Sequence, residues 1–453
     1  MSRRHPGQRI RLAIMAAMTD AQPKDFDIII AGGGLVGATL ACLLAPLRLR
    51  VAVLDRAPFN PDAIAFNQPS LCFDPRVSAI TRASQELFRQ LEIWPTITAS
   101  RSCAYTDMDV WDADGTGAIH FASTEVNQPE LGHIIENSLI LAALYERLGE
   151  SGQTELISPC TITGLHRADE MHCIETEEGN EFRARLIVAA DGGQSIIRKL
   201  AEFNTREWDY AHEALVTTVR TEKPHNNTAL QRFINTGPLA FLPLREGSDS
   251  DAAQQGNQQH NQQGGNNNGT RQDNQHHCSI VWSMVPTLAQ EVMQLSDTAF
   301  HKKLGFAIEH RLGKITWSDK RFCFPLRQCH ATNYVQPGIA LIGDAAHTIH
   351  PLAGQGVNLG LLDAKVLSEE LSRALAANRS PGDLTVLRRY QRRRKTHNLS
   401  MMWLMEGFKY LFAEQPMPLR WLRNIGMSGT NKTPLIKQQL ARHAMGLNKN
   451  PLF

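Results

Sequence analysis

The feature that most constrains this chain is a strand, a glycine turn, a helix and a second strand between Phe26 and Asp55. The turn reads Gly32-x-Gly34-x-x-Gly37, and both strands are continuously apolar, as in a buried parallel sheet. Such a turn lets backbone N–H groups approach a pyrophosphate at the helix N-terminus, and an acid ending the second strand accepts hydrogen bonds from a ribose. The sequence therefore predicts a dinucleotide-binding α/β fold, against the less favoured alternative of a turn that only packs.

Two later blocks repeat the pattern of a strand that ends in an acid and glycines before a helix. The second block contains Asp191 and Gly192, and Asp191 taken alone is also typical of a helix N-cap. The third begins at Gly343 and Asp344 and continues through a glycine-rich loop to residues 356–358. Its acid can bind a ribityl hydroxyl, and the N-termini of the loop and helix can stabilise negative charge on a flavin ring. The first block fits either FAD or NAD, and the later two favour FAD.

Together the three blocks resemble the aromatic hydroxylase class of flavoproteins, similar in plan to p-hydroxybenzoate hydroxylase. Residues 74–80, 237–243 and 311–315 further resemble the ubiquinone-biosynthesis hydroxylase family, of the 2-octaprenyl-6-methoxyphenol hydroxylase type. The likeness spans residues 26–412. It implies an α/β fold, with a Rossmann-like FAD-binding domain interleaved with a β-sheet substrate domain and followed by C-terminal helices.

The expected domain order follows from this resemblance and from changes in composition. We expect a disordered leader at 1–24, FAD-binding segments at 25–100, 136–200 and 331–380, substrate-domain segments at 101–135 and 201–330, and a helical C-terminal region at 381–453. The basic leader could instead be a mitochondrial presequence, a less favoured interpretation, or follow from an upstream start codon. Residues 248–277 are rich in Gln, Asn and Gly, and we expect a disordered hairpin insertion because they have little apolar surface to bury.

The resemblance also carries over a set of cofactor-binding positions. They are Gly32, Gly34, Gly37 and Asp55 for the ADP half, Arg76 for an FAD phosphate or ribose, Asn137 as a further FAD contact, Asp191, Gly192, Gly343 and Asp344 for the flavin half, and Gly356, Val357 and Asn358 for the isoalloxazine.

His347 and Pro351 are the candidate catalytic residues, although the flavin is expected to carry the chemistry. Pro351 would line the substrate side of the ring, and His347 is either a general base or, as we favour, a residue that structures its loop. No metal site is predicted, because the eight cysteines form no C-x-x-C pair and His347 and His350 have no acids or thiols at ligand spacing.

The family resemblance implies a monooxygenase mechanism. NAD(P)H would reduce FAD, reduced FAD would take up O2 to give a C4a-hydroperoxide, and the phenolic ring would attack its distal oxygen. The expected substrate is a polyprenylated phenol of ubiquinone biosynthesis. Two alternatives stay open: a flavin-dependent reductase or dehydrogenase on a prenyl or aromatic substrate, and a non-catalytic flavoprotein subunit of a biosynthetic complex.

Charge and hydropathy bear on location and partners. The 47 Lys and Arg residues balance 45 Asp and Glu, which argues against a nucleic-acid partner. No apolar run reaches the roughly 18 to 20 residues that span a bilayer, so we expect a cytoplasmic enzyme. Because a prenylated substrate lies in the membrane, we also expect peripheral contact with its inner face or with other ubiquinone-biosynthesis proteins. The basic run 388–395 and the aromatic stretch 401–412 could form that contact or pack on the FAD domain or a neighbouring subunit; the oligomeric state stays open.

Overall fold

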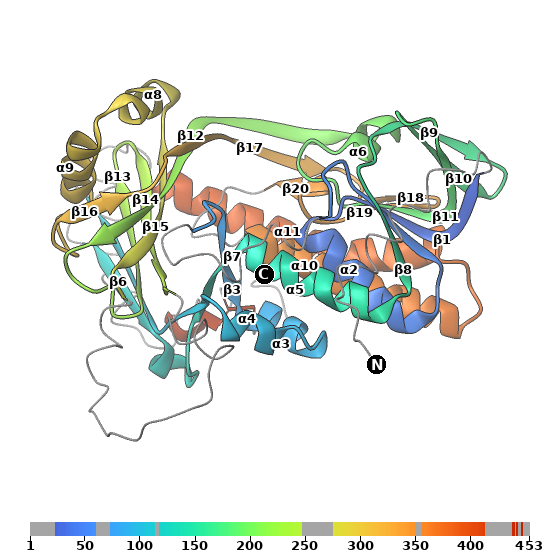
Figure 1. Cartoon of the computed structure of the whole chain (residues 1–453), viewed down its shortest axis with the longest axis horizontal. Coiled ribbons are helices and arrows are strands. Elements are labelled where there is room, and N and C mark those ends of the chain that lie inside the picture. The colour runs from blue at the N-terminus through green and yellow to red at the C-terminus, as the bar shows by residue number, and fades with distance from the viewer. Residues whose placement is uncertain are drawn as a thin grey trace, which may run out of the picture.

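The computed structural model describes residues 23–59, 73–113, 117–246, 275–348 and 356–412, with short stretches at 437–439, 441–442 and 445–446. Within these residues, two large β-sheets lie at opposite ends of an elongated molecule and a small sheet lies between them (Figure 1). The predicted leader and most of the predicted insertion fall outside the described residues, and the strand after the insertion begins at His277.

The first sheet has a parallel centre, as its continuously apolar strands predict. Its path is β18 (Val335–Gln336), β19 (Ile339–Leu341), β11 (Glu181–Ala189), β1 (Lys24–Ala31), β2 (Val51–Leu54) and β8 (Thr154–Ile157), and β10 (Met171–Thr176) and β9 (Ile162–Ala168) branch from β11. The strands from β19 to β8 are parallel to one another. The turn residues Glu178-Gly179-Asn180 predict a hairpin whose outgoing strand rejoins this sheet, and the structure confirms it as β10–β11, with β11 beside β1.

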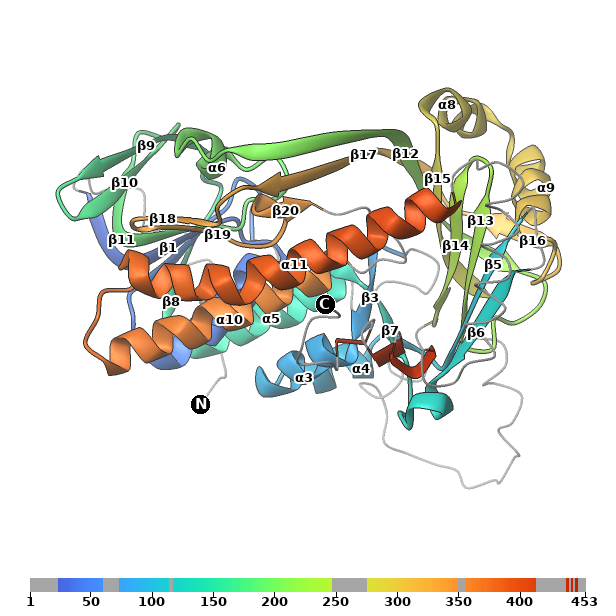
Figure 2. The same ribbon diagram turned by 180° about the vertical axis from the view of Figure 1, so that it is seen from behind.

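Four helices cover one side of this sheet. They are α2 (Leu35–Leu44), α5 (Asn137–Ser151), α10 (Gly356–Ala376) and α11 (Leu384–Phe412), and they lie side by side in both views (Figures 1 and 2). Their apolar faces and the sheet form one core cluster that includes Ile28, Leu40 and Leu361, all fully buried. The basic run and the aromatic stretch near the C-terminus belong to one helix, α11.

The second sheet is mostly antiparallel. Its path is β20 (His347–Thr348), β17 (Phe322–Ala331), β12 (Thr205–Thr221), β15 (His277–Met284), β14 (Gly237–Leu244), β13 (Thr228–Ile234), β5 (Asp107–Asp112) and β6 (Ala118–Ala122), with β16 (Ile315–Ser318) paired to β12. The alternating pattern of residues 108–121 predicts a hairpin, and the structure confirms it as the antiparallel pair β5–β6. On one face, Trp282 packs under α8 (Pro286–Gln294) and α9 (Asp297–Ala307). Strands β12 and β17 are long enough to reach from this sheet to the first one (Figure 1).

The third sheet joins the two larger units. It contains β3 (Val77–Thr81), β7 (Gly132–Glu136) and β4 (Cys103–Tyr105). The helices α3 (Arg82–Gln90) and α4 (Trp94–Ala99) lie between β3 and β4 in the sequence. Ala79 and Ile134 of this sheet pack against Ala240 and Leu242 of the second. The predicted fold class is therefore confirmed: a Rossmann-like unit is interleaved in sequence with a β-sheet unit, and long helices follow.

Candidate cofactor site and active site

The three sequence blocks meet at one edge of the first sheet. Strands β1, β2, β11 and β19 are parallel, so their carboxyl ends lie at the same edge. The residues that follow these ends are Gly32, Asp55, Asp191 and Asp344. Nucleotides bind at this edge in open α/β sheets, because the loops there are free to surround a ligand.

The three glycines of the first turn have different surroundings. Gly32 has φ +104°, and a Cβ added there would lie 2.4 Å from the carbonyl oxygen of Ala190. A Cβ on Gly37 would lie 2.0 Å from the carbonyl oxygen of Gly32. A Cβ on Gly34 would meet nothing within 4 Å. Two glycines are thus required by packing, whereas Gly34 leaves open space at the N-terminus of α2.

Asp55 holds the turn in place. Its carboxylate accepts hydrogen bonds from the N–H of Gly33 at 2.6 Å and of Ala57 at 2.7 Å. The Tyr145 hydroxyl donates to the Gly33 carbonyl oxygen at 2.6 Å. Because a carboxylate has about four acceptor positions and Asp55 is partly exposed, it can still accept from a ligand hydroxyl.

Asp191 has one oxygen engaged and one without a partner. Its Oδ2 accepts from the backbone N–H groups of Ile196 and Ile197, at 2.7 and 3.2 Å, at the start of α6 (Ile196–Leu200). The capping role that the sequence left open is therefore present. Its Oδ1 is buried and has no hydrogen-bond partner among the described residues. Burial raises the pKa of Asp191, and a Cβ on the adjacent Gly192 would meet nothing within 4 Å. A buried acceptor beside open space suits a ligand that supplies a hydroxyl donor.

Asp344 is presented on a short helical turn after β19. Gly343 has φ +58° and packs against Val36 of α2, which brings the third block against the first. The Asp344 side chain is exposed, while the protein packed around it raises the pKa of its carboxyl. Asp344 can therefore accept a hydrogen bond from a ligand at the same edge as Asp191.

Arg76 and Asn137 are neighbours, although they lie far apart in the sequence. Strand β3 pairs with β7, so Arg76 precedes β3 where Asn137 begins α5. The Asn137 N–H donates to the Arg76 carbonyl oxygen at 3.0 Å, and the Ser78 hydroxyl donates to Asn137 Oδ1 at 2.6 Å. The Arg76 side chain is exposed and available to an anion.

The N-terminus of α10 is fixed to the third sheet by Asn358. Its side-chain amide donates to the Ala79 carbonyl oxygen at 2.8 Å, and its Oδ1 accepts from the Thr81 N–H at 3.0 Å. The side chain of Asn358 is thus buried in a structural contact. Gly356 and Val357 are only partly buried, and a Cβ on Gly356 would meet nothing within 4 Å. The helix N-terminus therefore opens toward free space.

A buried ionic cluster lies behind the third block. Asp363 of α10 is fully buried, and its Oδ2 lies 2.6 Å from His347 Nε2 and accepts from the Gly343 N–H at 3.0 Å. Its Oδ1 accepts from Arg394 of α11 at 2.7 Å and from Asn398 at 3.1 Å. Although burial alone would raise the pKa of Asp363, the charges of His347 and Arg394 hold it well below its usual value.

Sequence reasoning missed Asp363 and Arg394. Residues 359–377 have the apolar spacing of a helix, so the available signal was an acid on its apolar face and an arginine within the basic run. His347 is almost fully buried, which agrees with the loop-structuring interpretation. Pro351 and His350 lie outside the described residues, so the role expected for Pro351 stays a prediction.

The edge described above fits the FAD that the sequence implies. Open space adjoins Gly34, Gly192 and Gly356, and the Oδ1 of Asp191, next to Gly192 in the sequence, has no hydrogen-bond partner among the described residues. Two helix N-termini, those of α2 and α10, supply partial positive charge for the cofactor's anionic parts.

Comparison with known proteins decides the family. The model of the family described as "FAD binding domain" matches residues 25–402. The 3-demethoxyubiquinol 3-hydroxylase of Escherichia coli is 33% identical over 421 residues, covering 93% of this chain and 98% of that protein. The chain belongs to the FAD-binding hydroxylase family of ubiquinone biosynthesis. This hydroxylase is an FAD-dependent monooxygenase, and NAD(P)H is the reductant typical of the family.

Other relatives extend the same similarity. The hydroxylase is 32% identical to the ubiquinone hydroxylase UbiL of Rhodospirillum rubrum, covering 95% of this chain and 92% of that one. It is 33% identical to the mitochondrial ubiquinone biosynthesis monooxygenase COQ6 of Drosophila melanogaster, covering 93% and 90%. Among solved structures, p-nitrophenol 4-monooxygenase PnpA of Pseudomonas putida aligns with a TM-score of 0.70 at 16% identity, covering 94% of this chain and 99% of that one. That last likeness shows the shared fold.

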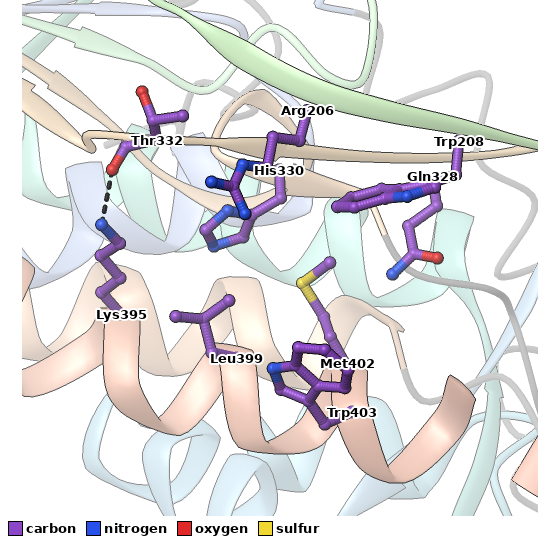
Figure 3. Close-up of a pocket in the computed structure, with 9 residues that line it drawn as sticks. All are labelled: Arg206, Trp208, Gln328, His330, Thr332, Lys395, Leu399, Met402 and Trp403. Carbon is purple, nitrogen blue, oxygen red and sulfur yellow. Dashed lines mark hydrogen bonds between the residues drawn. The ribbon is translucent and has the colours of Figure 1, made fainter. Parts of the chain in front are cut away.

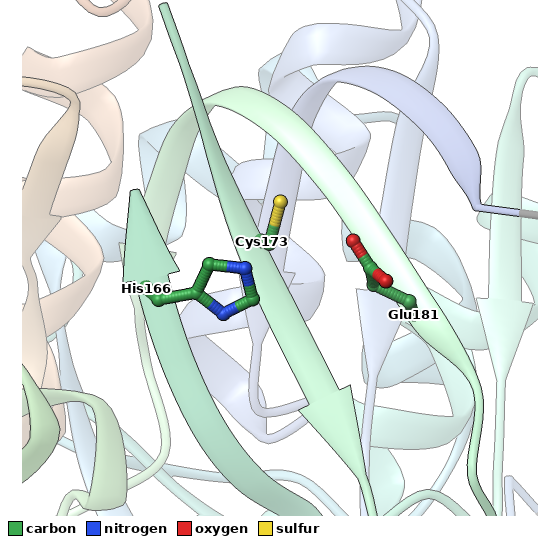
Figure 4. Close-up of side chains that lie close together, drawn as sticks. All are labelled: His166, Cys173 and Glu181. Carbon is green, nitrogen blue, oxygen red and sulfur yellow. The ribbon is translucent and has the colours of Figure 1, made fainter. Parts of the chain in front are cut away.

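A separate group of potential metal ligands lies on the outer strands of the first sheet. His166, Cys173 and Glu181 of β9, β10 and β11 have ligand atoms within 4.8 Å of one another (Figure 4). His166 Nδ1 also lies 3.2 Å from Glu175. Burial and the adjacent Glu181 raise the pKa of the Cys173 thiol to about 11, so the thiol form is favoured. A cysteine binds zinc as the thiolate, and structural zinc sites use four ligands. We therefore assign no metal role to this group of the hydroxylase.

The helices that the structure describes include none with the length and apolar character required to cross a bilayer.

Proposed function

We propose that this hydroxylase places one oxygen atom from O2 on the aromatic ring of a polyprenylated phenol in ubiquinone biosynthesis. The observation that carries the proposal is the similarity, over more than nine-tenths of the chain, to proteins named for hydroxylation in that pathway. The convergence of three cofactor blocks at one sheet edge supports it, because such an enzyme needs its flavin bound beside a substrate wall.

We propose that FAD lies across the carboxyl edge of the first sheet. The N-terminus of α2 at Gly34 would face the pyrophosphate, with Gly32 and Gly37 shaping the turn and Asp55 accepting from the adenosine ribose. Arg76 and Asn137 would contact phosphate or ribose.

The flavin half would lie at the other blocks. Asp191 and Asp344 would accept from ribityl hydroxyls, while Gly192 leaves open space for the ribityl chain and Gly343 holds its turn against Val36. The N-terminus of α10, at residues 356–358, would present backbone N–H groups to the ring.

When bound, FAD supplies the electron transfer from NAD(P)H and the activation of O2. The chain's task is then to orient the ring and exclude water. Ala214, Val216 and Leu326 form a buried apolar cluster on the second sheet. They alternate along the strands with Leu215 and Val219, which pack under α8 and α9, so they face the opposite side. We propose that this apolar side is the wall against which the prenylated ring packs.

We propose a positioning role for His347. Its Nε2 is occupied by Asp363, so the pair fixes the loop that carries Asp344 and does not present a free base to substrate.

The test is oxygen incorporation. Purified protein holding FAD should oxidise NAD(P)H faster when a prenylated phenol is added, and mass spectrometry should find one atom of ¹⁸O in the product from ¹⁸O2. A reductase would consume NAD(P)H without labelling its product, and a non-catalytic subunit would bind FAD with no stimulation by any phenol. Deleting the gene should cause an unhydroxylated quinone precursor to accumulate.

A further inference from the structure

A pocket of about 390 Å³ lies between the β12–β17 strand pair and α11, and its lining includes none of the residues assigned to the cofactor (Figure 3). We call it the Trp groove. It is lined by Arg206 and Trp208 of β12, Gln328 and His330 of β17, Thr332, and Lys395, Leu399, Met402 and Trp403 of α11. The lining also includes none of the residues proposed for the substrate wall, which are Ala214, Val216 and Leu326.

One end of the Trp groove is cationic. Lys395 donates to the Thr332 carbonyl oxygen at 2.5 Å, and neither Lys395 nor Arg206 has a carboxylate partner within the described ranges. Burial, together with the charges of His347, Lys395 and Arg206, lowers the pKa of His330 to about 4, so its ring is neutral near pH 7. The lining contains no acidic residue. Two positive charges are therefore left for an anion from outside.

The other end is apolar and aromatic. Trp208 is 49% exposed and Trp403 is 74% exposed, with Met402 between them in the close-up (Figure 3). The aromatic surface continues along β17, where Phe322 and Phe324 are 38% and 42% exposed and their rings stack at 6.5 Å. Alternate residues of a strand share a face, so these rings lie on the same side of β17 as Leu326 of the proposed substrate wall and as Gln328 and His330 of the groove.

The exposed face of α11 continues the charge pattern. Arg388 and Arg392 are exposed and precede Lys395 and Leu399 at spacings of three or four residues, which places them along one side of the helix. The helix thus presents arginines first, then the Lys395 end of the groove, then Leu399 and Trp403.

We propose that the Trp groove and this side of α11 dock on a bilayer that contains anionic phospholipids. A lipid phosphate lies between Arg206 and Lys395, while Trp208 and Trp403 lie at the level of the headgroups, where amphipathic rings are favoured. Cations near an anionic membrane surface and buried aromatic area both contribute to such binding. The inference deepens the proposed function, because it brings the enzyme to the bilayer that holds a prenyl tail.

The test is co-sedimentation of the full-length, FAD-loaded protein with vesicles. Protein should bind vesicles of phosphatidylcholine mixed with phosphatidylglycerol and bind phosphatidylcholine alone much more weakly. The double variant Arg206→Gln/Lys395→Gln should lose about fivefold in affinity for each cation removed. The matched control, Lys302→Gln/Lys314→Gln, removes the same charge from exposed positions near α9 and should bind as the wild type does.

A second variant tests the aromatic part. Trp403→Ala should weaken vesicle binding by a comparable factor and should reduce the blue shift of tryptophan fluorescence that vesicles induce. FAD content and NAD(P)H oxidation with a short-chain phenol in detergent should stay at wild-type levels in all these variants. That readout separates failure of docking from failure of the proposed function.

Three outcomes would overturn the proposal. The groove variants could bind the mixed vesicles as well as the wild type, or the control pair could lose as much affinity as the groove pair. Alternatively, Trp403→Ala could abolish self-association in analytical ultracentrifugation and leave vesicle binding intact, which would assign the groove to a second copy of the chain.

Discussion

The imidazole of His347 lies 2.6 Å from the carboxylate of Asp363, and both side chains are buried. The pair joins the loop that presents Asp344 to the helix whose N-terminus opens on the cofactor site. Arg394 adds α11 to the same cluster through its 2.7 Å hydrogen bond to Asp363. Asp363 is not among the residues expected to contact substrate, yet its hydrogen bonds fix the position of the loop that carries Asp344.

Replacing Asp363 with Asn should destabilise the protein strongly. Arg394 would stay buried without a counter-charge, a situation that costs about 3 to 5 kcal/mol. Urea unfolding should show this loss, and FAD retention should fall because the single amide oxygen of Asn cannot accept from both Gly343 and Arg394. Glu369→Gln is the control: Glu369 pairs with Arg393 at the surface, where a pair contributes less than about 1 kcal/mol. Equal losses in the two variants would contradict the role assigned to the cluster.

Two alanine substitutions in the first glycine turn should have opposite consequences. Gly34→Ala has room and an ordinary backbone, with φ −65°, so the apoprotein should keep its stability while FAD affinity falls. Gly37→Ala would place a Cβ 2.0 Å from a carbonyl oxygen, and overpacking of this kind costs about 3 kcal/mol or more. Thermal unfolding of the apoproteins and flavin fluorescence titration measure the two effects. Undiminished FAD binding by Gly34→Ala would argue against a pyrophosphate at this turn.

Stability should fall on acidification through the buried ring of His225. Its Nε2 lies 3.0 Å from the Leu244 carbonyl oxygen, and its Nδ1 accepts the Asn227 N–H, so only the neutral form satisfies both contacts. Burial lowers the pKa of His225 to about 4, against about 6.5 in the unfolded chain. The neutral ring therefore contributes about 3 kcal/mol to the free energy of unfolding above about pH 6.5. This contribution is lost as the pH falls toward 4.

The variant His225→Gln should show a shallower loss of unfolding free energy between those pH values, even if it is less stable at pH 7. His310→Gln, at an exposed position, should keep the wild-type slope. Identical slopes in the two variants would be inconsistent with a neutral His225.

The contact between the first and third blocks should be sensitive to one methyl group. A Cβ on Gly360 of α10 would lie 2.6 Å from a Val36 methyl and 3.0 Å from the Gly343 Cα. Gly360→Ala should therefore cost about 1 to 3 kcal/mol and weaken FAD binding by separating α10 from α2. Because Val36 supplies the closest contact, adding Val36→Ala should restore part of the loss in a double-mutant cycle. If the changes in unfolding free energy of the two variants simply added, the contact with Val36 would not be the source of the strain.

The sequence was sufficient for the parts of the site that are local. The turn at Gly32, the acid at Asp55 and the strand ends at Asp191 and Asp344 each follow from a few consecutive residues, and parallel pairing then brings them to one edge. The hairpins β5–β6 and β10–β11 were predicted for the same reason.

Features that depend on long-range packing could not be predicted. Asp363 and Arg394 are 31 residues apart on different helices, and nothing local indicates that their side chains meet. The Trp groove likewise combines Trp208, Gln328 and Trp403, which are brought together only by the strand pair and the helix that crosses it. The capping contact of Asp191 was foreseen, but its second oxygen is left without a partner only because of the surrounding fold.

The pairing of β17 with β20 has a mechanical consequence. His330 and Cys329 of the long strand are registered with His347 and Thr348, so the sheet proposed to hold the substrate ring is hydrogen-bonded to the loop proposed to hold the flavin. A hinge that opened one unit away from the other would have to break this ladder. The strand that carries Leu326 of the substrate wall is therefore tied through its own backbone to the loop that presents Asp344.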